Sequence, residues 1–283
     1  MVVSRETLAG LRMALPRLKS DDAIAAALKT AGAQVDTFAL TQTIPIESEQ
    51  LEQMRQRLAS GYYAWVVLSS WRAAQAVLPQ LNSLALAPAS ALTPHSPTSA
   101  PTRLAVVGQS TANWVNTHCA LKPTLVGAGS AAKLLEVFPT PPATPATPQQ
   151  PAVTMPAAPA TICLPQSQLA APTLAQGLSQ LGWQVDAVAT YTTVPLPQLP
   201  AHLKTQWQAG AWDAVVVTAG SSAQALLQLL GPPPEKTAVV SIGKSTTARC
   251  RELGLRVDAT AATPRAEHIT QAIINLFKAK DFS

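Results

Sequence analysis

The sequence contains few charged residues, and this shortage excludes two classes of protein. Charged side chains make up 12% of the 283 residues and apolar ones 47%, so the chain can bury a core and is not of the disordered, highly charged kind. The 20 Lys and Arg exceed the 15 Asp and Glu, which gives a net charge of +5, but they form no basic cluster. We therefore expect no nucleic-acid partner, whereas the positive bias suits an anionic small molecule.

Cysteine is also scarce. Cys119, Cys163 and Cys250 lie far apart without a Cys-x-x-Cys pair, and the four histidines show no ligand spacing, which argues against a disulfide framework and a metal site. The N-terminus lacks the apolar core of a signal peptide, and no apolar run reaches the roughly 18 residues of a membrane-spanning helix. We expect a cytoplasmic protein with no metal and no membrane partner.

Nucleotide motifs are missing as well. Gly243-Lys244-Ser245 resembles the end of a P-loop, but position 238, where the first glycine of that motif belongs, is Ala. No Gly-x-Gly-x-x-Gly pattern follows an expected strand, and no local Ser-His-Asp or Cys-His signature occurs. A nucleotide-dependent enzyme is therefore disfavoured, and any chemistry must need little from acid–base side chains.

What is present is an alternation of short β-branched runs with helical patterns, which is typical of parallel sheets covered by helices. Strands are expected at 13–15, 64–68, 104–107, 124–126, 162–164, 214–217, 238–242 and 256–258, and helices at 21–30, 72–81, 172–181, 222–230 and 265–277. Asp21 and Asp22 are placed to cap the first helix, and Gly32 and Gly182 to end helices. Residues 85–102 and 139–160, rich in Pro and Ala, are expected to be exposed loops.

An internal repeat is the clearest signal in the chain. Residues 14–45 match 163–195, with Gln-Val-Asp at 34–36 and 184–186. Two further pairs of segments match in the same order along the chain: 65–78 with 214–227, and 106–112 with 241–247. Because the period is too long for a solenoid, the repeat indicates a duplicated domain.

Small polar turns follow the expected strands. Ligands of doubly wound sheets bind beyond the carboxyl ends of the strands, and amides at helix starts attract carboxylates or phosphates. Each such hydroxyl is, taken alone, more often a helix cap than a ligand. Six turns of this kind favour a shared ligand, and they lie at 69–70, 108–111, 127–130, 166–167, 218–222 and 243–247.

Tyr191 lies in Ala-Thr-Tyr-Thr-Thr-Val-Pro, where the chain is expected to cross between lobes. It is either a β-forming residue of a connecting strand or a phenol donor that assists a leaving hydroxyl. Its repeat partner is Thr41, so the duplication kept the aromatic ring on one side only.

Taken together, these segments resemble uroporphyrinogen-III synthase over nearly the whole chain outside the two Pro/Ala-rich stretches. The motifs that carry the resemblance are Leu68-Ser69-Ser70-Trp71-Arg72-Ala73, Gly108-Gln109-Ser110-Thr111-Ala112, Gly182-Trp183-Gln184-Val185 followed by Tyr191-Thr192-Thr193, Val217-Thr218-Ala219, and Gly243-Lys244-Ser245-Thr246.

The resemblance implies two similar doubly wound α/β lobes joined by a two-stranded β connection, with a cleft between them. Lobe one would comprise 1–38 plus 194–283, lobe two 46–186, and the connecting strands 39–45 and 187–193. It also implies a cofactor-free lyase of haem and related tetrapyrrole biosynthesis, which closes linear hydroxymethylbilane to uroporphyrinogen III with loss of water and inversion of the last pyrrole ring. We expect a monomer that receives its substrate from hydroxymethylbilane synthase.

The resemblance also suggests site residues. Tyr191 is expected to be catalytic, assisting departure of the hydroxyl. The substrate-binding residues are expected to be Arg17, Ser69, Ser70, Arg72, Thr111, Thr218, Ser221, Ser222, Lys244 and Thr246. Ala219 stands where the family often has Ser, and Leu15-Pro16-Arg17 replaces a Thr-Arg-Pro strand end. A two-lobed cytoplasmic protein that binds a polyanionic small molecule without turnover is the alternative.

Overall fold

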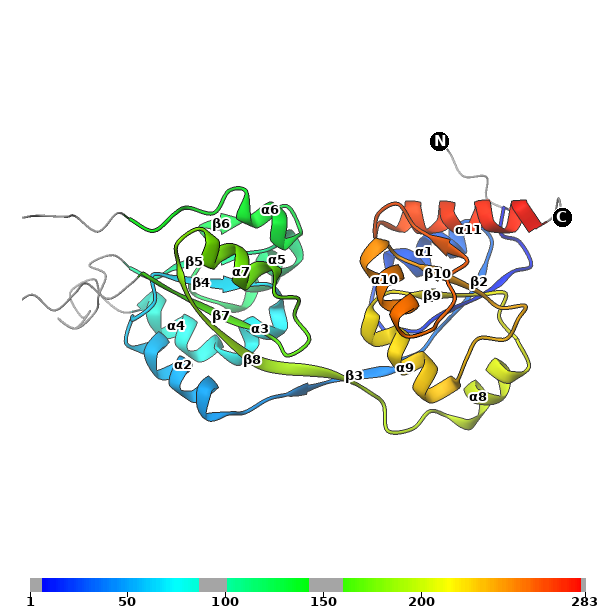
Figure 1. Cartoon of the computed structure of the whole chain (residues 1–283), viewed down its shortest axis with the longest axis horizontal. Coiled ribbons are helices and arrows are strands. Elements are labelled where there is room, and N and C mark those ends of the chain that lie inside the picture. The colour runs from blue at the N-terminus through cyan, green and yellow to red at the C-terminus, as the bar shows by residue number, and fades with distance from the viewer. Residues whose placement is uncertain (1–6, 87–100, 143–159, 281–283) are drawn as a thin grey trace, which may run out of the picture. The chain divides into compact units, whose positions relative to one another are not determined.

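The computed structural model describes residues 7–86, 101–142 and 160–280, so most of both expected Pro/Ala-rich loops, 85–102 and 139–160, lies outside the described residues. The chain divides into two units: unit 1 comprises Met1–Thr43 with Thr193–Ser283, and unit 2 comprises Ile44–Thr192. Figure 1 shows helices packed around one sheet in each unit. Within the described ranges, no helix is long and apolar enough to cross a membrane.

Unit 1 is built on a five-stranded parallel sheet. Its strand order is β11-β10-β9-β1-β2, with β1 at Arg12–Leu15, β2 at Gln34–Thr37, β9 at Ala214–Val217, β10 at Ala238–Ser241 and β11 at Ala259–Thr260. Its helices are α1 (Ala23–Thr30), α8 (Ala201–Gln208), α9 (Gly220–Leu230), α10 (Lys244–Glu252) and α11 (Ala266–Lys280).

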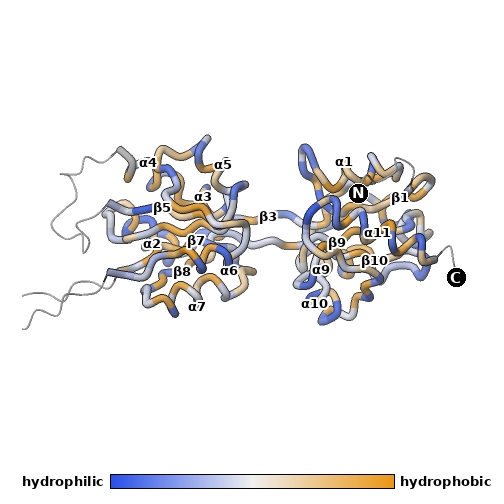
Figure 2. The backbone as a smooth tube through the Cα atoms, turned by 90° about the horizontal axis from the view of Figure 1, so that it is seen from above, coloured by the Kyte–Doolittle hydropathy of each residue, from blue (hydrophilic) through white to orange (hydrophobic). Residues whose placement is uncertain are grey.

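Both faces of this sheet are buried. Met13 and Val216 pack on one face with side chains of α1 and α11. Ala14 and Val215 pack on the other face with side chains of α8, α9 and α10. Successive strand residues point to opposite faces, so an apolar run such as that of β9 fits a sheet covered on both sides, and the inner strands carry the hydrophobic colour in Figure 2.

Unit 2 has a six-stranded sheet of order β3-β8-β7-β4-β5-β6. The strands are β3 (Thr41–Pro45), β4 (Trp65–Leu68), β5 (Arg103–Val106), β6 (Leu125–Val126), β7 (Thr161–Ser167) and β8 (Gln184–Pro195). The helices are α2 (Glu49–Ala59), α3 (Trp71–Ala76), α4 (Leu78–Leu86), α5 (Gln109–His118), α6 (Ala131–Leu135) and α7 (Thr173–Gln180). Separate apolar clusters again cover its two faces, which confirms the predicted doubly wound α/β class.

Each unit combines the first two strands of one copy of the repeat with the later strands of the other copy, so the copies exchange their first two strands. Strands β1 and β2 of the first copy join β9, β10 and β11 of the second, whereas β7 and β8 join β4, β5 and β6. The registers agree, since Met13 pairs with Ala214 in unit 1 and Ile162 pairs with Trp65 in unit 2. Each unit therefore has the flavodoxin-like order, in which the direction of chain progression reverses between β1 and β9, and between β7 and β4.

The chain passes from one unit to the other within β3 and β8. The Ile46 amide donates to the Thr190 carbonyl at 3.0 Å, and the Leu196 amide donates to the Leu40 carbonyl at 2.9 Å. Because residue numbers rise along one strand as they fall along the other, the two strands run antiparallel.

The repeated Gln-Val-Asp triplets end on two structural aspartates. Asp36 accepts a hydrogen bond of 2.8 Å from the Trp212 indole and pairs with Arg12. Asp186 accepts a hydrogen bond from the Tyr63 phenol. Each hydrogen bond joins the second strand of one copy to the residues that precede the inner strand of the other copy. The two aspartates therefore have the same structural role in both units.

Two predicted elements differ from the structure. The helix expected over 72–81 is interrupted at Val77, because Pro79 has no amide to donate to Gln75 and is tolerated only in the first turn of α4. The strand expected at 256–258 is a loop, and β11 follows it. There the Arg256 guanidinium donates to the Thr237 carbonyl, and the Asp258 carboxylate accepts from the Val239 amide at 2.7 Å.

Candidate functional site

Helices that lack a side-chain cap begin at the carboxyl ends of three strands. Gly108, Ala219 and Gly243 precede α5, α9 and α10, and none of them provides a side-chain hydrogen bond to the helix start. By contrast, Ser70 and Ser130 cap their helices. A helix start without a side-chain cap presents amide donors to an anion, so these strand ends suit a polyanionic ligand.

Ser70 and Tyr191 meet in unit 2. The Ser70 Oγ and the Tyr191 hydroxyl are 3.0 Å apart, and the same Oγ accepts a hydrogen bond of 3.2 Å from the Ala73 amide. Both side chains are half-buried. Since Ser70 follows β4 and Tyr191 is paired with Ser167 at the end of β7, the two hydroxyls lie at the switch point of the sheet, where ligands of this fold class bind.

Ser69 and Arg72 lie on either side of Ser70 in the chain, and both are exposed. Ser70 directs its hydroxyl toward Tyr191 because the cap bond to Ala73 fixes its rotamer at the helix start. The Arg72 guanidinium lies over the Trp71 ring, 4.6 Å from its centroid.

Thr111 and Thr246 are repeat partners in the first turns of α5 and α10. Their relative solvent exposures are 7% and 6%. Among the described residues, neither hydroxyl has a hydrogen-bond partner. Gly108 stands just before α5, where an added Cβ would lie 3.0 Å from the Gly129 Cα. The absence of a side chain at Gly108 lets the turn at 127–130 lie close to the start of α5.

Unit 1 carries the remaining predicted residues. Thr218 and Ser221 are half-buried at the end of β9 and the start of α9, where Ser222 is buried. Lys244 is the exposed first residue of α10. These residues follow the neighbouring strands β9 and β10, so they share one edge of the unit 1 sheet.

Arg17 follows β1 at the same edge, but a carboxylate already occupies part of its guanidinium. Its Nε and Nη2 donate to the two oxygens of Asp22 at 2.5 and 2.7 Å. Asp22 also caps α1 through the Ile24 and Ala25 amides. Burial works to raise the pKa of Asp22, but the bonds from Arg17 and the two amides outweigh it and hold that pKa below its usual value.

The sequence reasoning missed two features of these edges. Trp71 contacts Trp114, with ring centroids 6.0 Å apart. In unit 1, the Thr247 hydroxyl lies 2.5 Å from Ser241 Oγ and 2.8 Å from Thr260 Oγ1. The repeat could have indicated the second feature, because the two copies differ at this position: one has Thr247 and the other has Ala112.

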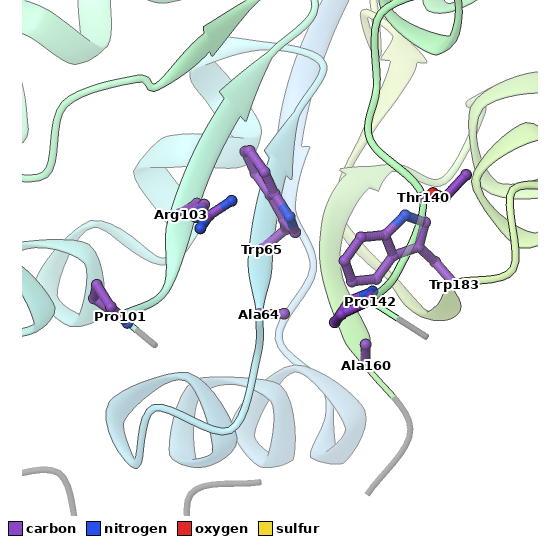
Figure 3. A pocket seen from close by; sticks show the side chains of 8 residues that line it. All are labelled: Ala64, Trp65, Pro101, Arg103, Thr140, Pro142, Ala160 and Trp183. Carbon is purple, nitrogen blue, oxygen red and sulfur yellow. The ribbon is translucent and has the colours of Figure 1, made fainter. Parts of the chain in front are cut away.

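A cavity of about 280 Å³ lies at the opposite, amino end of the unit 2 sheet. Figure 3 shows Trp65 and Trp183 along it, with Arg103 beside Trp65. Trp65 and Arg103 begin β4 and β5, and Trp183 precedes β8. No predicted site residue lines this cavity, so it is separate from the strand ends that carry the hydroxyl pair.

A family model and two solved structures that resemble this chain carry the same family name. The model of the family uroporphyrinogen-III synthase HemD matches residues 22–271. A mutant uroporphyrinogen III synthase from the extremely thermophilic bacterium Thermus thermophilus is similar in structure, with a TM-score of 0.56 and 17% identity over 95% of this chain and 100% of that chain. Uroporphyrinogen-III synthetase from Helicobacter pylori 26695 gives 0.58 and 15% over 94% and 99%.

At these identities the two solved structures support the fold, and the family match supports membership. The family match spans most of the chain and includes the motifs around Ser70, Thr111, Tyr191 and Thr246. The chain belongs to the uroporphyrinogen-III synthase family, an enzyme family of tetrapyrrole biosynthesis.

Proposed function

We propose that this chain closes linear hydroxymethylbilane to uroporphyrinogen III, with loss of water and inversion of the last pyrrole ring, and that it does so without a cofactor. The observation that carries the proposal is the contact of 3.0 Å between Ser70 Oγ and the Tyr191 hydroxyl at the sheet's switch point. Ser70 and Tyr191 are both predicted site residues, and each carries a hydroxyl that can donate a proton.

The proposed reaction requires the Tyr191 hydroxyl to donate its proton to the substrate. Either hydroxyl of the pair can donate to the other. In the proposed arrangement Ser70, whose Oγ already accepts from the Ala73 amide, donates its own proton to the phenol oxygen. The Tyr191 proton is then free to point at the hydroxymethyl oxygen of the substrate. As the C–O bond breaks, electrons from the pyrrole nitrogen form an azafulvenium cation, and the oxygen leaves as water with the Tyr191 proton, which leaves Tyr191 as a phenolate. The proton released when the closed ring regains aromaticity restores Tyr191.

The rest of the task is to hold the chain curled, so that ring closure occurs at the substituted carbon of the last ring. This is a matter of proximity and orientation. The acetate and propionate groups of the substrate match the amide donors at the starts of α5, α9 and α10. The side chains we propose for binding are Arg17, Ser69, Ser70, Arg72, Thr111, Thr218, Ser221, Ser222, Lys244 and Thr246.

These residues differ in what they can offer. Arg72 and Lys244 are exposed cations, whereas Arg17 shares its guanidinium with Asp22 and keeps only its remaining N–H groups for a ligand. The hydroxyls of Thr111 and Thr246 have no partner among the described residues, so a substrate carboxylate can satisfy them.

The test supplies freshly made hydroxymethylbilane to the purified chain, oxidises the products and resolves the porphyrin isomers. Isomer III is expected in excess of the protein-free control. Isomer I alone, as in spontaneous closure, would reject the proposal and favour a binding protein without turnover.

We further propose that the protein is a cytoplasmic monomer that receives the unstable bilane from hydroxymethylbilane synthase. Sedimentation at working concentration tests the first point, and a dimer would contradict it. For the second, the two enzymes together should form less isomer I than is formed when isolated bilane is added to the same amount of this chain.

A further inference from the structure

Trp71 leaves a large apolar ring on the surface at the first turn of α3. The side chain is 36% exposed, although burying an indole would ordinarily stabilise the fold. It directly follows Ser70, whose hydroxyl contacts Tyr191. An exposed indole beside this pair calls for a reason other than core packing.

Arg72 supplies such a reason. Its guanidinium lies over the Trp71 ring, 4.6 Å from the centroid, which is within the range of a cation–π contact. Two other arginines of unit 2 bind carboxylates, since Arg55 pairs with Glu47 and Arg57 with Asp186. Among the described residues, no carboxylate or carbonyl accepts a hydrogen bond from Arg72. A guanidinium that lies over an aromatic ring keeps N–H donors available for a carboxylate.

The Trp71 indole also contacts helix α5. Trp71 packs against Trp114 of α5 with centroids 6.0 Å apart, and Trp114 stacks on His118 at 4.4 Å with ring planes 9° apart. The His118 Nδ1 in turn lies 2.8 Å from the Trp114 carbonyl oxygen. The platform beneath Arg72 is thus anchored along α5 and does not depend on the ligand.

The repeat restricts this arrangement to unit 2. The positions of unit 1 that correspond to Trp71 and Arg72 are Gly220 and Ser221. A substrate whose two ends must be treated differently requires an asymmetric set of charge partners, and this pair supplies one.

We propose that Trp71 is a positioning residue, whose ring holds Arg72 ready to bind one carboxylate of the tetrapyrrole beside the Ser70–Tyr191 pair. The inference rests on the proposed function and names a determinant of substrate binding for it. Because the carboxylate is bound in the ground state and in the transition state alike, loss of the contact raises KM and leaves kcat nearly unchanged.

A double-mutant cycle tests this role. Trp71→Leu should raise KM about 2- to 5-fold, the factor that corresponds to an exposed cation–π contact, with kcat within about twofold. Arg72→Gln should raise KM about tenfold or more. In the Arg72→Gln background, Trp71→Leu should have no further effect, because its only route to the substrate is through Arg72. Trp71→Phe should retain part of the wild-type KM.

The outcomes separate cleanly. If Trp71→Leu raises KM by the same factor in both backgrounds, or in neither, Trp71 does not act through Arg72 and the inference is wrong. Failure of the wild-type chain to make isomer III would instead reject the proposed function.

A matched control exists on the same sheet. Arg103 also lies over a tryptophan, Trp65, at 5.6 Å, but at the amino end, away from the strand ends that carry Ser70. Arg103→Gln should leave KM unchanged. Thermal unfolding of each variant shows whether the fold is retained.

Discussion

Ser70 and Tyr191 are 121 positions apart in the chain, yet the sheet brings their hydroxyls into contact. Sequence motifs indicated both residues, but their contact could not be predicted, since it depends on the pairing of β7 with β4 and β8. The same holds for Arg17. Its position at a strand end was predicted, but its bidentate pair with Asp22 requires the geometry of the turn between them.

Tyr191→Phe should lower kcat about 100-fold, the low end of what a positioned proton donor contributes, and leave the melting temperature nearly unchanged, since the side chain is only half-buried. Initial rates of isomer III formation and a thermal melt measure both effects. Tyr62→Phe is the control, because Tyr62 is a half-buried tyrosine of the same unit that lies beside Tyr63. An unchanged rate for Tyr191→Phe would remove its proposed role.

Asp22 should make folding stability depend on pH. Its pKa is held below the usual value in the folded state, so its contribution is fully present above about pH 4, the ordinary value for Asp. The contribution is lost as pH falls through the lower folded pKa. Asp22→Asn should therefore cost about 1–2 kcal/mol at pH 6 and less at pH 3, as measured by urea unfolding. Asp21→Asn, at the exposed neighbouring position, should cost little at either pH; equal losses would contradict this account.

At the scale of elements, the hydrophobic runs predicted the inner strands well, because strands buried on both faces must be continuously apolar. Short elements at the edges were less predictable. β11 has two residues, and its place after 256–258 depends on the Asp258 carboxylate and the Arg256 guanidinium, which occupy the backbone groups of neighbouring segments.

The turn between β6 and α6 should be sensitive to a single methyl group. A Cβ added at Gly127 would lie 2.7 Å from the Val107 carbonyl oxygen and 3.0 Å from Leu134 Cβ, so Gly127→Ala should destabilise the fold by about 1–3 kcal/mol. The same change at Gly243, which has an extended backbone and no atom within 4 Å of the added Cβ, should leave stability nearly unchanged. Chemical denaturation of both variants tests the contrast, and equal effects would contradict it.

For the whole molecule, the repeat predicted two similar units, and the resemblance to the family implied that their segments are interleaved along the chain. The sheets themselves combine strands of both copies, with β1 and β2 beside β9 and with β7 and β8 beside β4. The boundaries within β3 and β8 could not be predicted, because a strand that passes between units shows no change of hydrophobic pattern at the crossing.

The exchange has a consequence for folding. The apolar clusters of unit 2 contain only residues between Leu51 and Val188, so a fragment of residues 44–192 should fold alone with a cooperative unfolding transition. A fragment of residues 1–138, which holds one complete repeat copy, should not fold, because β1 and β2 lack their partners β9 and β10. Circular dichroism and urea titration of both fragments test this, and a cooperative transition for 1–138 would contradict the exchanged arrangement.

We propose that the chain directs bilane closure through the hydroxyl pair of Ser70 and Tyr191. The most direct measurement is the isomer III fraction formed from fresh hydroxymethylbilane as enzyme concentration rises, for the wild type and for Tyr191→Phe. We expect the wild type to drive the product toward isomer III, and the variant to need about 100-fold more protein to reach the same fraction. A wild-type product that stays isomer I at every concentration would contradict it.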